Sequence, residues 1–237
     1  LDMDLLKKEV VPHRNFNNKI SQSMQNATEK FYPDFITPMA AVAGSVADNI
    51  LNVLVKDSKL EKAYVNNGGD VSFYLTENQT VKSSLASIPN IIAEINYKDK
   101  SRGIATSGWR GRSFSLGIAD SVTVLADNAA MADAAATMIA NSVNIKNHPL
   151  IIKKPAEEIY EDSDLKNLMV TVEVGDLKQS EIEDALKNGN EVGKKYLENG
   201  LINAALIELH NCFCIVQKES TNLNFINKSS LKKINYV

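Results

Sequence analysis

Residues 63–75 read AYVNNGGDVSFYL, in which two apolar runs flank an Asn-Asn-Gly-Gly-Asp segment. An Asn-Gly step between such runs is a strong signal for a β-hairpin, because glycine accepts the positive φ angles of a tight turn. The sequence therefore predicts two antiparallel strands that meet at this turn. Period-two or β-branched patterns predict further strands over 91–97, 102–106, 121–126, 168–174 and 204–216, the last of them broken near its start.

Helical spacing of apolar residues predicts helices on both sides of these strands. They are expected over residues 16–31, over 39–56 after Thr37-Pro38, from Asp127 or Asn128 to about Ser142, from a capping box at Ser180–Glu183, and over 190–199. Strands and helices interleave without the regular alternation of a doubly wound parallel fold. The sequence thus predicts an α+β fold, in which mixed, mostly antiparallel sheets pack against helices.

The composition is that of a globular protein. The chain has 237 residues, of which 44% are hydrophobic and 23% charged, which argues against disorder, a fibrous repeat or a disulfide scaffold. We expect a single domain over residues 1–217 and a polar tail over 218–237. The tail carries four lysines against one glutamate and has no clear period, which indicates a poorly packed end or, alternatively, a basic docking segment.

Charge and hydropathy also exclude classes of partner. The net charge is -3 and no arginine-rich stripe occurs, so nucleic-acid binding is not expected. No unbroken run of 18 apolar residues and no signal peptide are visible, which favours a cytoplasmic protein without a membrane partner. Cys212 and Cys214 are expected to be small buried hydrophobic residues, since a metal or redox site would need further ligands.

Three segments are candidates for ligand binding. The first is the turn Asn67-Gly68-Gly69-Asp70. Two glycines bring bare backbone amides close to a ligand, and Asp70 could accept a hydroxyl or orient the turn. The alternative is a plain hairpin turn.

The second candidate lies within residues 103–115, where Thr106, Ser107 and Gly108 precede Arg112. Hydroxyl groups and backbone amides hold phosphate oxygens, and an arginine adds a planar pair of donors. Trp109 could stack on a flat ring. The alternative is a solvated loop with a half-buried tryptophan.

The third candidate is the pair Asp133 and Thr137, which lie four residues apart and hence on one face of the helix predicted there. A carboxylate and a hydroxyl on an alanine-lined helix suit Mg²⁺, which takes few protein ligands and completes its shell with water and phosphate oxygens. The alternative is an exposed pair on a stable helix.

Taken together, these segments resemble the ApbE-like superfamily, whose best-known members are magnesium-dependent FAD:protein FMN transferases. The matching stretches occur in the family's order: Asn67-Gly68-Gly69-Asp70, Ala105-Thr106-Ser107-Gly108, Ser121-Val122-Thr123-Val124 and Ala132-Asp133-Ala134-Ala135-Ala136-Thr137. The closer match is a divergent cytosolic branch of the superfamily, to which Thr37–Gly44, Gly117–Asp120, Leu177–Leu186 and Gly200–Leu206 are similar.

The resemblance implies a T-fold-like architecture, either as one domain or as two tightly packed halves, with a small-molecule cleft between the motifs. It implies FAD or FMN as cofactor, with Asn67, Gly68, Gly69, Asp70, Thr106, Ser107, Gly108 and Arg112 at its site. It further implies Mg²⁺ at Asp133 and Thr137, and by analogy a homodimer that forms through sheet edges.

The chain also departs from the family. FMN transferases carry a His-x-x-Asp-Pro-x-Thr-Gly segment where residues 113–120 read SFSLGIAD, and the divergent branch has Gly-His-Ser where this chain has Gly111-Arg112-Ser113. Arginine stays protonated and is a poor general base, which leaves Asp120 as the remaining candidate. The resemblance therefore predicts flavin binding and leaves two alternatives to FMN transfer: a non-flavin enzyme, for example in sulfur assimilation, or a non-catalytic binding subunit.

Overall fold

The structure is a computed structural model that describes residues 2–84, 91–218, 224–227 and 232–236. Its helices are α1 (Met3–Leu6), α2 (Lys19–Thr28), the 3-10 helices η1 (Glu29–Phe31) and η2 (Pro38–Ala41), α3 (Val42–Lys56), α4 (Ala129–Ser142), α5 (Ala156–Ile159) and α6 (Gln179–Glu198). Its strands are β1 (Lys62–Asn67), β2 (Asp70–Leu75), β3 (Thr80–Ser84), β4 (Ile91–Asn96), β5 (Gly103–Ser107), β6 (Ser121–Ala126), β7 (Ile151–Pro155), β8 (Met169–Val174), β9 (Ala204–Leu209), β10 (Cys212–Gln217), β11 (Asn224–Asn227) and β12 (Lys232–Lys233).

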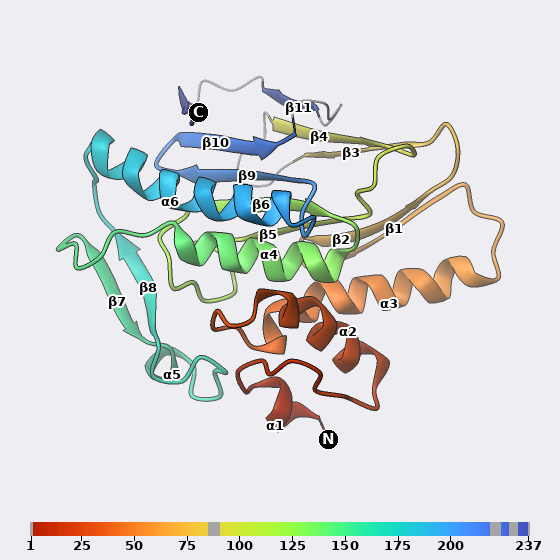
Figure 1. The fold of residues 1–237 in the computed structure, drawn as a ribbon, viewed down its shortest axis with the longest axis horizontal. Helices are drawn as coiled ribbons and strands as arrows, with labels where there is room; N and C mark the ends of the chain where they lie inside the picture. The colour runs from red at the N-terminus through yellow and green to blue at the C-terminus, as the bar shows by residue number, and fades with distance from the viewer. Residues whose placement is uncertain (1, 85–90, 219–223, 228–231, 237) are drawn as a thin grey trace.

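A seven-stranded sheet in the order β1-β2-β5-β6-β9-β10-β12 forms the centre of the fold (Figure 1). Its pairs are antiparallel except for β10 with β12. A three-stranded sheet, β11-β4-β3, and the separate hairpin β7-β8 complete the strands. The α+β class with mostly antiparallel sheets is therefore confirmed, and Asn67 stands opposite Asp70 across the turn of the first hairpin, as predicted.

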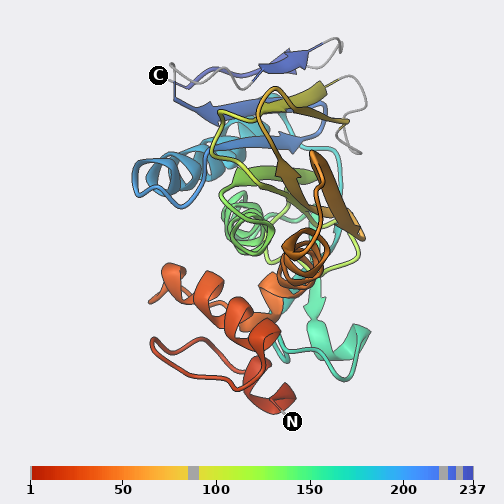
Figure 2. The same ribbon diagram turned by 90° about the vertical axis from the view of Figure 1, so that its right-hand side faces the viewer.

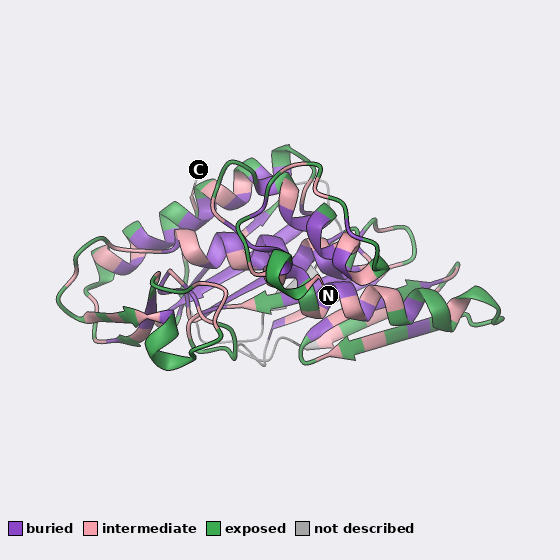
Figure 3. Cartoon of the chain, turned by 90° about the horizontal axis from the view of Figure 1, so that it is seen from below, coloured by how far each residue is buried: buried purple, intermediate pink, exposed green. Residues whose placement is uncertain are grey.

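The two faces of the large sheet carry two separate cores, and the layers are seen from the side in Figure 2. Helices α4 and α6 cover one face, and the three-stranded sheet covers the other. All six residues of β6 are buried; Val122 and Val124 join the core on the helical side, whereas Leu125 joins the opposite core. Burial on both faces therefore includes two polar residues of β6, Ser121 and Thr123, besides its four apolar ones. The same concentration of buried residues at the centre is visible in Figure 3.

Helix α4 lies at the centre of the helical layer and is approached by bare backbone from two sides. An added Cβ at Gly44 on α3 would lie 2.2 Å from the carbonyl oxygen of Ala129, and one at Gly103 on β5 would lie 2.1 Å from the carbonyl carbon of Asn128. Only glycine permits such contacts. The first turn of α4 is thus fixed between α3 and β5.

Two predictions of element boundaries are wrong. Helix α6 is continuous over Gln179–Glu198, where separate helices were expected, and its N-cap is Lys178, whose N–H donates to Oε2 of Glu181 at 2.7 Å. Residues 204–216 form the hairpin β9-β10, which turns at His210 and Asn211, both at positive φ. A polar pair that adopts the left-handed region gave a two-residue turn where the apolar pattern predicted one broken strand.

The tail is better packed than expected in its described parts. Strand β11 pairs with β4, and β12 pairs with β10. The N–H of Ile234 donates to the Phe213 carbonyl at 2.8 Å, and the Tyr236 hydroxyl donates to the Glu183 carbonyl at 2.6 Å. Lys228 falls outside the described residues.

The cysteine prediction is confirmed, because Cys212 and Cys214 are both free and buried, and burial raises the pKa of Cys214 to about 12. The expectation that no helix spans a membrane stays a prediction. By length and composition alone the helical run Pro38–Lys56 is apolar enough to cross a membrane, although polar residues interrupt it. Part of this run packs against α4 and the hairpin β1-β2, and a third of its most apolar stretch is buried.

Candidate functional site

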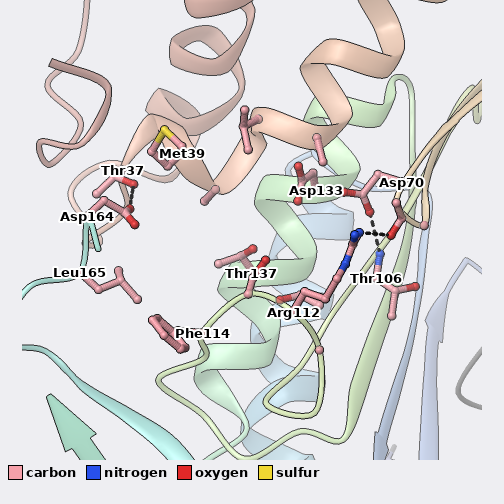
Figure 4. A pocket seen from close by; sticks show the side chains of 18 of the residues that line it. Thr37, Met39, Asp70, Thr106, Arg112, Phe114, Asp133, Thr137, Asp164 and Leu165 are labelled. Atoms are coloured by element: carbon pink, nitrogen blue, oxygen red, sulfur yellow. Dashed lines mark hydrogen bonds between the residues drawn. The ribbon is translucent and has the colours of Figure 1, made fainter. Parts of the chain in front are cut away.

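A cavity of about 860 Å³ lies where the three predicted segments meet, and Figure 4 shows its labelled side chains. It is bounded by the N-terminal segment through the start of α3, the β1-β2 turn, the loop after β5, the exposed side of α4 and the loop that follows α5. A volume of this size suits a small organic ligand. Its walls come from segments more than 100 residues apart in the sequence, so the whole fold is needed to form it.

The hairpin turn supplies backbone to this cavity. Gly68 and Gly69 line it, with φ angles of 69° and 116°, and the N–H of Gly69 donates to Oδ1 of Asn66 at 2.8 Å. Asn67 does not line the cavity. Its side-chain amide instead donates to the Ala43 carbonyl at 3.1 Å and thereby ties the turn to the start of α3.

Asp70 begins β2 and its side chain is largely buried at the cavity wall. Its Oδ1 accepts a hydrogen bond from the N–H of Thr106 at 3.3 Å. Burial raises the pKa of Asp70 to about 6, although the Thr106 N–H and the nearby Arg112 guanidinium act in the opposite direction. Asp70 therefore changes charge near neutral pH.

The loop after β5 lines the cavity with Thr106, Ser107, Gly108 and Arg112. The guanidinium Nη2 of Arg112 donates to the Gly68 carbonyl at 2.6 Å, so this side chain bridges the loop and the hairpin turn. Arg112 is otherwise exposed, and its remaining N–H groups are available for a phosphate or carboxylate.

Asp133 and Thr137 both line the cavity from α4. Oδ2 of Asp133 accepts a hydrogen bond from the N–H of Gly44 at 3.0 Å, at the close approach of α3. Burial raises the pKa of Asp133 well above its usual value, and the nearby Asp70 raises it further, whereas N–H groups of Ala43 and Gly44 oppose the shift. Two neighbouring carboxylates in a sheltered wall thus favour a bound cation.

Sequence patterns did not indicate Asp48, whose hydrogen bonds join α3 to the first turn of α4 and to β2. Its two carboxylate oxygens accept hydrogen bonds from the N–H groups of Ala129 and Ala130 at 3.0 and 2.9 Å, and from the Ser72 hydroxyl at 2.6 Å. A carboxylate at a helix N-terminus satisfies free donors and interacts favourably with the helix dipole. A lone aspartate in the apolar helix α3 was the available signal.

The far end of the cavity was also missed. It is lined by Met39, Phe114 and Leu165 and by the hydrogen-bonded pair Thr37 and Asp164 (Figure 4). Leu165 and Asp164 belong to a polar connection with no periodic pattern. No signal in that stretch could have placed them at a site.

Comparison with known proteins identifies the family. A family model described as AbpE bacteria matches residues 2–219. The chain belongs to this ApbE-related family. It is also 40% identical over 114 residues to a UPF0280 protein of Methanococcoides burtonii, with 46% of this chain and 47% of the relative covered.

Other UPF0280 proteins are similar over comparable lengths. The protein of Methanobrevibacter smithii is 35% identical over 134 residues, covering 54% of this chain and 56% of the relative. The protein of Methanocaldococcus jannaschii is 31% identical over 144 residues, covering 58% and 57%. The chain therefore spans about half the length of the curated relatives it matches.

In this ApbE-related chain, Asp120 does not line the cavity described above. Its carboxylate accepts hydrogen bonds from Trp109 Nε1 at 3.1 Å, Arg110 Nε at 2.6 Å and the N–H of His210 at 2.7 Å. Arg110 stacks on the Trp109 ring at 4.6 Å from its centroid, and Trp109 packs against the core. Asp120 thus joins a loop to the β9-β10 turn, and neither it nor Trp109 takes the ligand-facing role expected from the sequence.

The residues of this ApbE-related site suit a Mg²⁺ ion that takes only a few of its ligands from the protein. Among the residues that the structure describes, no group of three or more His, Cys, Asp or Glu side chains is arranged to hold a metal ion. An all-protein cage is therefore not formed there. Asp133, Thr137 and the neighbouring Asp70 instead provide the few hard oxygen ligands that Mg²⁺ takes when a phosphate group and water complete its shell.

Proposed function

We propose that this protein binds a flavin nucleotide, FAD or FMN, or a similar phosphorylated aromatic ligand, together with Mg²⁺. The observation that carries the proposal is the buried Asp133, with a raised pKa, beside Asp70 in a cavity that also presents Arg112. A cation would remove the electrostatic penalty of the two carboxylates, and a phosphate would bind both the cation and the arginine.

Each predicted segment has a role in this arrangement. Asp133 and Thr137 would hold Mg²⁺, which would neutralise the ligand's phosphate charge. Arg112 would donate to phosphate oxygens, because its hydrogen bond to the Gly68 carbonyl uses one of its five N–H groups. Gly69 and Gly108 would present backbone without side chains to the ligand, and a side chain at either position would be strained by its positive φ.

We further propose that binding is separated from FMN transfer in this chain. Transfer to a hydroxyl acceptor needs a general base near the reacting group. Arg112 stays protonated, Asp120 is held by three donors outside the cavity, and Asp70, whose pKa of about 6 would suit a base, would be engaged by the cation beside Asp133. A divergent cytosolic branch of the family that binds the ligand without transferring it accounts for these features.

The test is calorimetry with FAD, FMN and ADP, each with and without Mg²⁺. We expect metal-dependent binding to the wild-type protein and at least a tenfold loss of affinity in Asp133→Asn, because the substitution removes the buried charge while keeping its shape. The matched control is Asp57→Asn at the exposed end of α3, which should bind as the wild type does. Unchanged metal-dependent binding by Asp133→Asn would overturn the assignment.

Transfer is tested separately with FAD and a peptide that carries serine or threonine. We expect no FMN-modified peptide in mass spectrometry under conditions in which FAD binds. Modified peptide that requires Asp133 would contradict the separation of binding from transfer and leave the binding site itself supported.

A further inference from the structure

The cavity has a second end of different chemistry from the one that holds the acidic pair. Phe114, Met39 and Leu165 give this end an apolar lining, and it closes at Thr37 and Asp164 (Figure 4). Phe114 follows Arg112 by two residues on the same loop. A ligand whose phosphate contacts Arg112 would therefore direct its flat ring toward these apolar side chains.

Thr37 and Asp164 are fixed to each other although 127 residues separate them. Thr37 is 2% exposed and is the N-cap of η2, and its hydroxyl donates to Oδ2 of Asp164. That contact uses the single proton of the hydroxyl, so the atoms that the pair still offers are acceptors. The buried threonine holds the carboxylate in one position at the cavity wall.

The charged groups around this pair leave Asp164 as the acceptor that faces the cavity. Lys7 also lines this end, but its Nζ is paired with Oδ2 of Asp162 at 2.5 Å. Asp162 itself is largely exposed, with 72% of its side-chain surface accessible. For Asp164, the described residues show a side-chain hydrogen bond only to Thr37, through Oδ2.

We propose that Asp164 is a specificity-determining residue, which accepts a hydrogen bond from an N–H group on the ring edge opposite the ligand's phosphate. The inference rests on the proposed function and narrows its ligand class to phosphorylated compounds whose flat ring carries such a donor. The apolar side chains would pack against the faces of the ring, and Asp164, positioned by Thr37, would accept the hydrogen bond from its edge. A ring with only acceptors there would give the carboxylate no donor besides Thr37 and would bind more weakly.

The experiment compares matched probes that differ by methylation of the donor: FMN against N3-methyl-FMN, and ADP against N6,N6-dimethyl-ADP, all with Mg²⁺. For the wild type we expect methylation to weaken binding about tenfold in at least one pair, the effect of losing a hydrogen bond to a charged group. In Asp164→Ala this ratio should fall to about one, as in a double-mutant cycle in which one interaction is removed from both sides.

Two further variants separate recognition from shape. Asp164→Asn keeps the side-chain volume and an oxygen for Thr37. If the methyl group were rejected on steric grounds alone, the ratio of the two affinities would stay as in the wild type. If the charge-assisted hydrogen bond is responsible, this ratio should drop at least threefold. Glu161→Ala is the control for a neighbouring exposed acid that does not line the cavity, and it should keep the wild-type ratio.

Each outcome decides between the two proposals. Equal ratios in the wild type and Asp164→Ala, with binding that still depends on Asp133, would overturn the role of Asp164 alone. Failure of every probe to bind the wild-type protein would overturn both the recognition at Asp164 and the proposed function.

Discussion

Asp70 and Asp133 lie on different elements, one at the start of a strand and one in a helix, and share one wall of the cavity. Each carboxylate is partly compensated by backbone N–H groups, at Thr106 for Asp70 and at Gly44 for Asp133. Burial nevertheless raises both pKa values. Backbone donors therefore fix the orientation of the acids without fully stabilising their charge, which leaves the site suited to a cation.

The pH dependence of the free energy of unfolding should reveal the cost of burying the ionised Asp70 carboxylate. Its pKa is 3.8 when unfolded and about 6 when folded, so between these values the folded protein binds more protons than the unfolded one. Stability from this group is then fully present below about pH 4 and is lost as the pH rises through 6. Asp70→Asn removes this loss, so its stability relative to the wild type should increase from pH 4 to pH 7.

Urea unfolding at several pH values measures this difference. The control is Asp57→Asn, an exposed acid, for which the difference should stay flat over the same range. With Mg²⁺ and ADP added, the trend for the wild type should shrink, because a bound cation favours the ionised form. A difference that falls with increasing pH would contradict the raised pKa of Asp70.

At the site, sequence motifs located the chemistry better than the individual contacts. Gly68, Gly69 and Asp70 line the cavity as the turn motif predicted, but Asn67 points to Ala43 and Asn66 lines the cavity instead. Neighbouring residues in a hairpin point to opposite sides, and two asparagines in sequence do not reveal which one faces the ligand. Asp164 could not be predicted, because its position depends on a tertiary contact with Thr37.

Among the elements, α4 holds its position through backbone contacts rather than interlocking side chains. Its buried face is almost entirely alanine, and glycines of α3 and β5 meet its first turn. Small side chains let the neighbouring backbones come close enough for the Gly44 N–H to reach Asp133. The geometry of the acidic wall therefore depends on residues that carry no functional group.

Gly44→Ala should test this dependence. The new Cβ would overlap the backbone of Ala129, so α3 and α4 must move apart, and we expect a loss of about 1–3 kcal/mol in the free energy of unfolding. Intrinsic helix propensity alone would favour alanine by about 1 kcal/mol, which is opposite in sign. Val53→Ala, on the exposed side of the same helix, should change stability by less than about 0.5 kcal/mol.

Ligand binding is the second measurement, and it distinguishes a local displacement of α3 from global destabilisation. Gly44→Ala should also weaken Mg²⁺-dependent binding of ADP, because the displacement of α3 would move the backbone N–H at this position away from Asp133. Stability equal to or above that of the wild type would show that the two helices have room to adapt.

The type of an element was predictable where a sequence pattern extended over many residues. The predicted boundaries were wrong where the chain turns without the usual glycine or proline. The buried strand β6 and helix α4 matched their predicted ranges, because β6 is rich in β-branched residues and α4 combines an Asn128 N-cap with an alanine-rich sequence. Residues 204–216 did not, since His210 and Asn211 form a turn without glycine. Strands β3 and β7 were not predicted at all, and β7 pairs only with β8, where tertiary context rather than a strong apolar alternation defines it.

Over the whole molecule, two peripheral segments meet across the cavity. The N-terminal segment and the loop after α5 are joined by Lys7 with Asp162 and by Thr37 with Asp164. The hairpin β7-β8, which carries that loop, is anchored at its base, where the Thr171 hydroxyl donates to the Gly117 carbonyl at 2.7 Å. Ligand binding should therefore further restrain this segment, most of whose residues are exposed or half-buried.

Hydrogen-deuterium exchange measures this effect. With ADP and Mg²⁺ we expect slower exchange in peptides that cover residues 156–168 than in peptides from the distant β9-β10 hairpin, because local opening governs exchange in loosely packed segments. Asp133→Asn, treated identically, should show little protection. Equal protection throughout the chain would indicate global stabilisation and contradict a local restraint.

The position of α1 has a practical consequence for preparing the protein. Met3 and Lys7 line the cavity, so a peptide joined close to the N-terminal side of α1 would lie near the ligand site. An affinity tag at that end is expected to slow ligand association and to lower measured affinities. Binding experiments should therefore use protein from which an N-terminal tag has been cleaved.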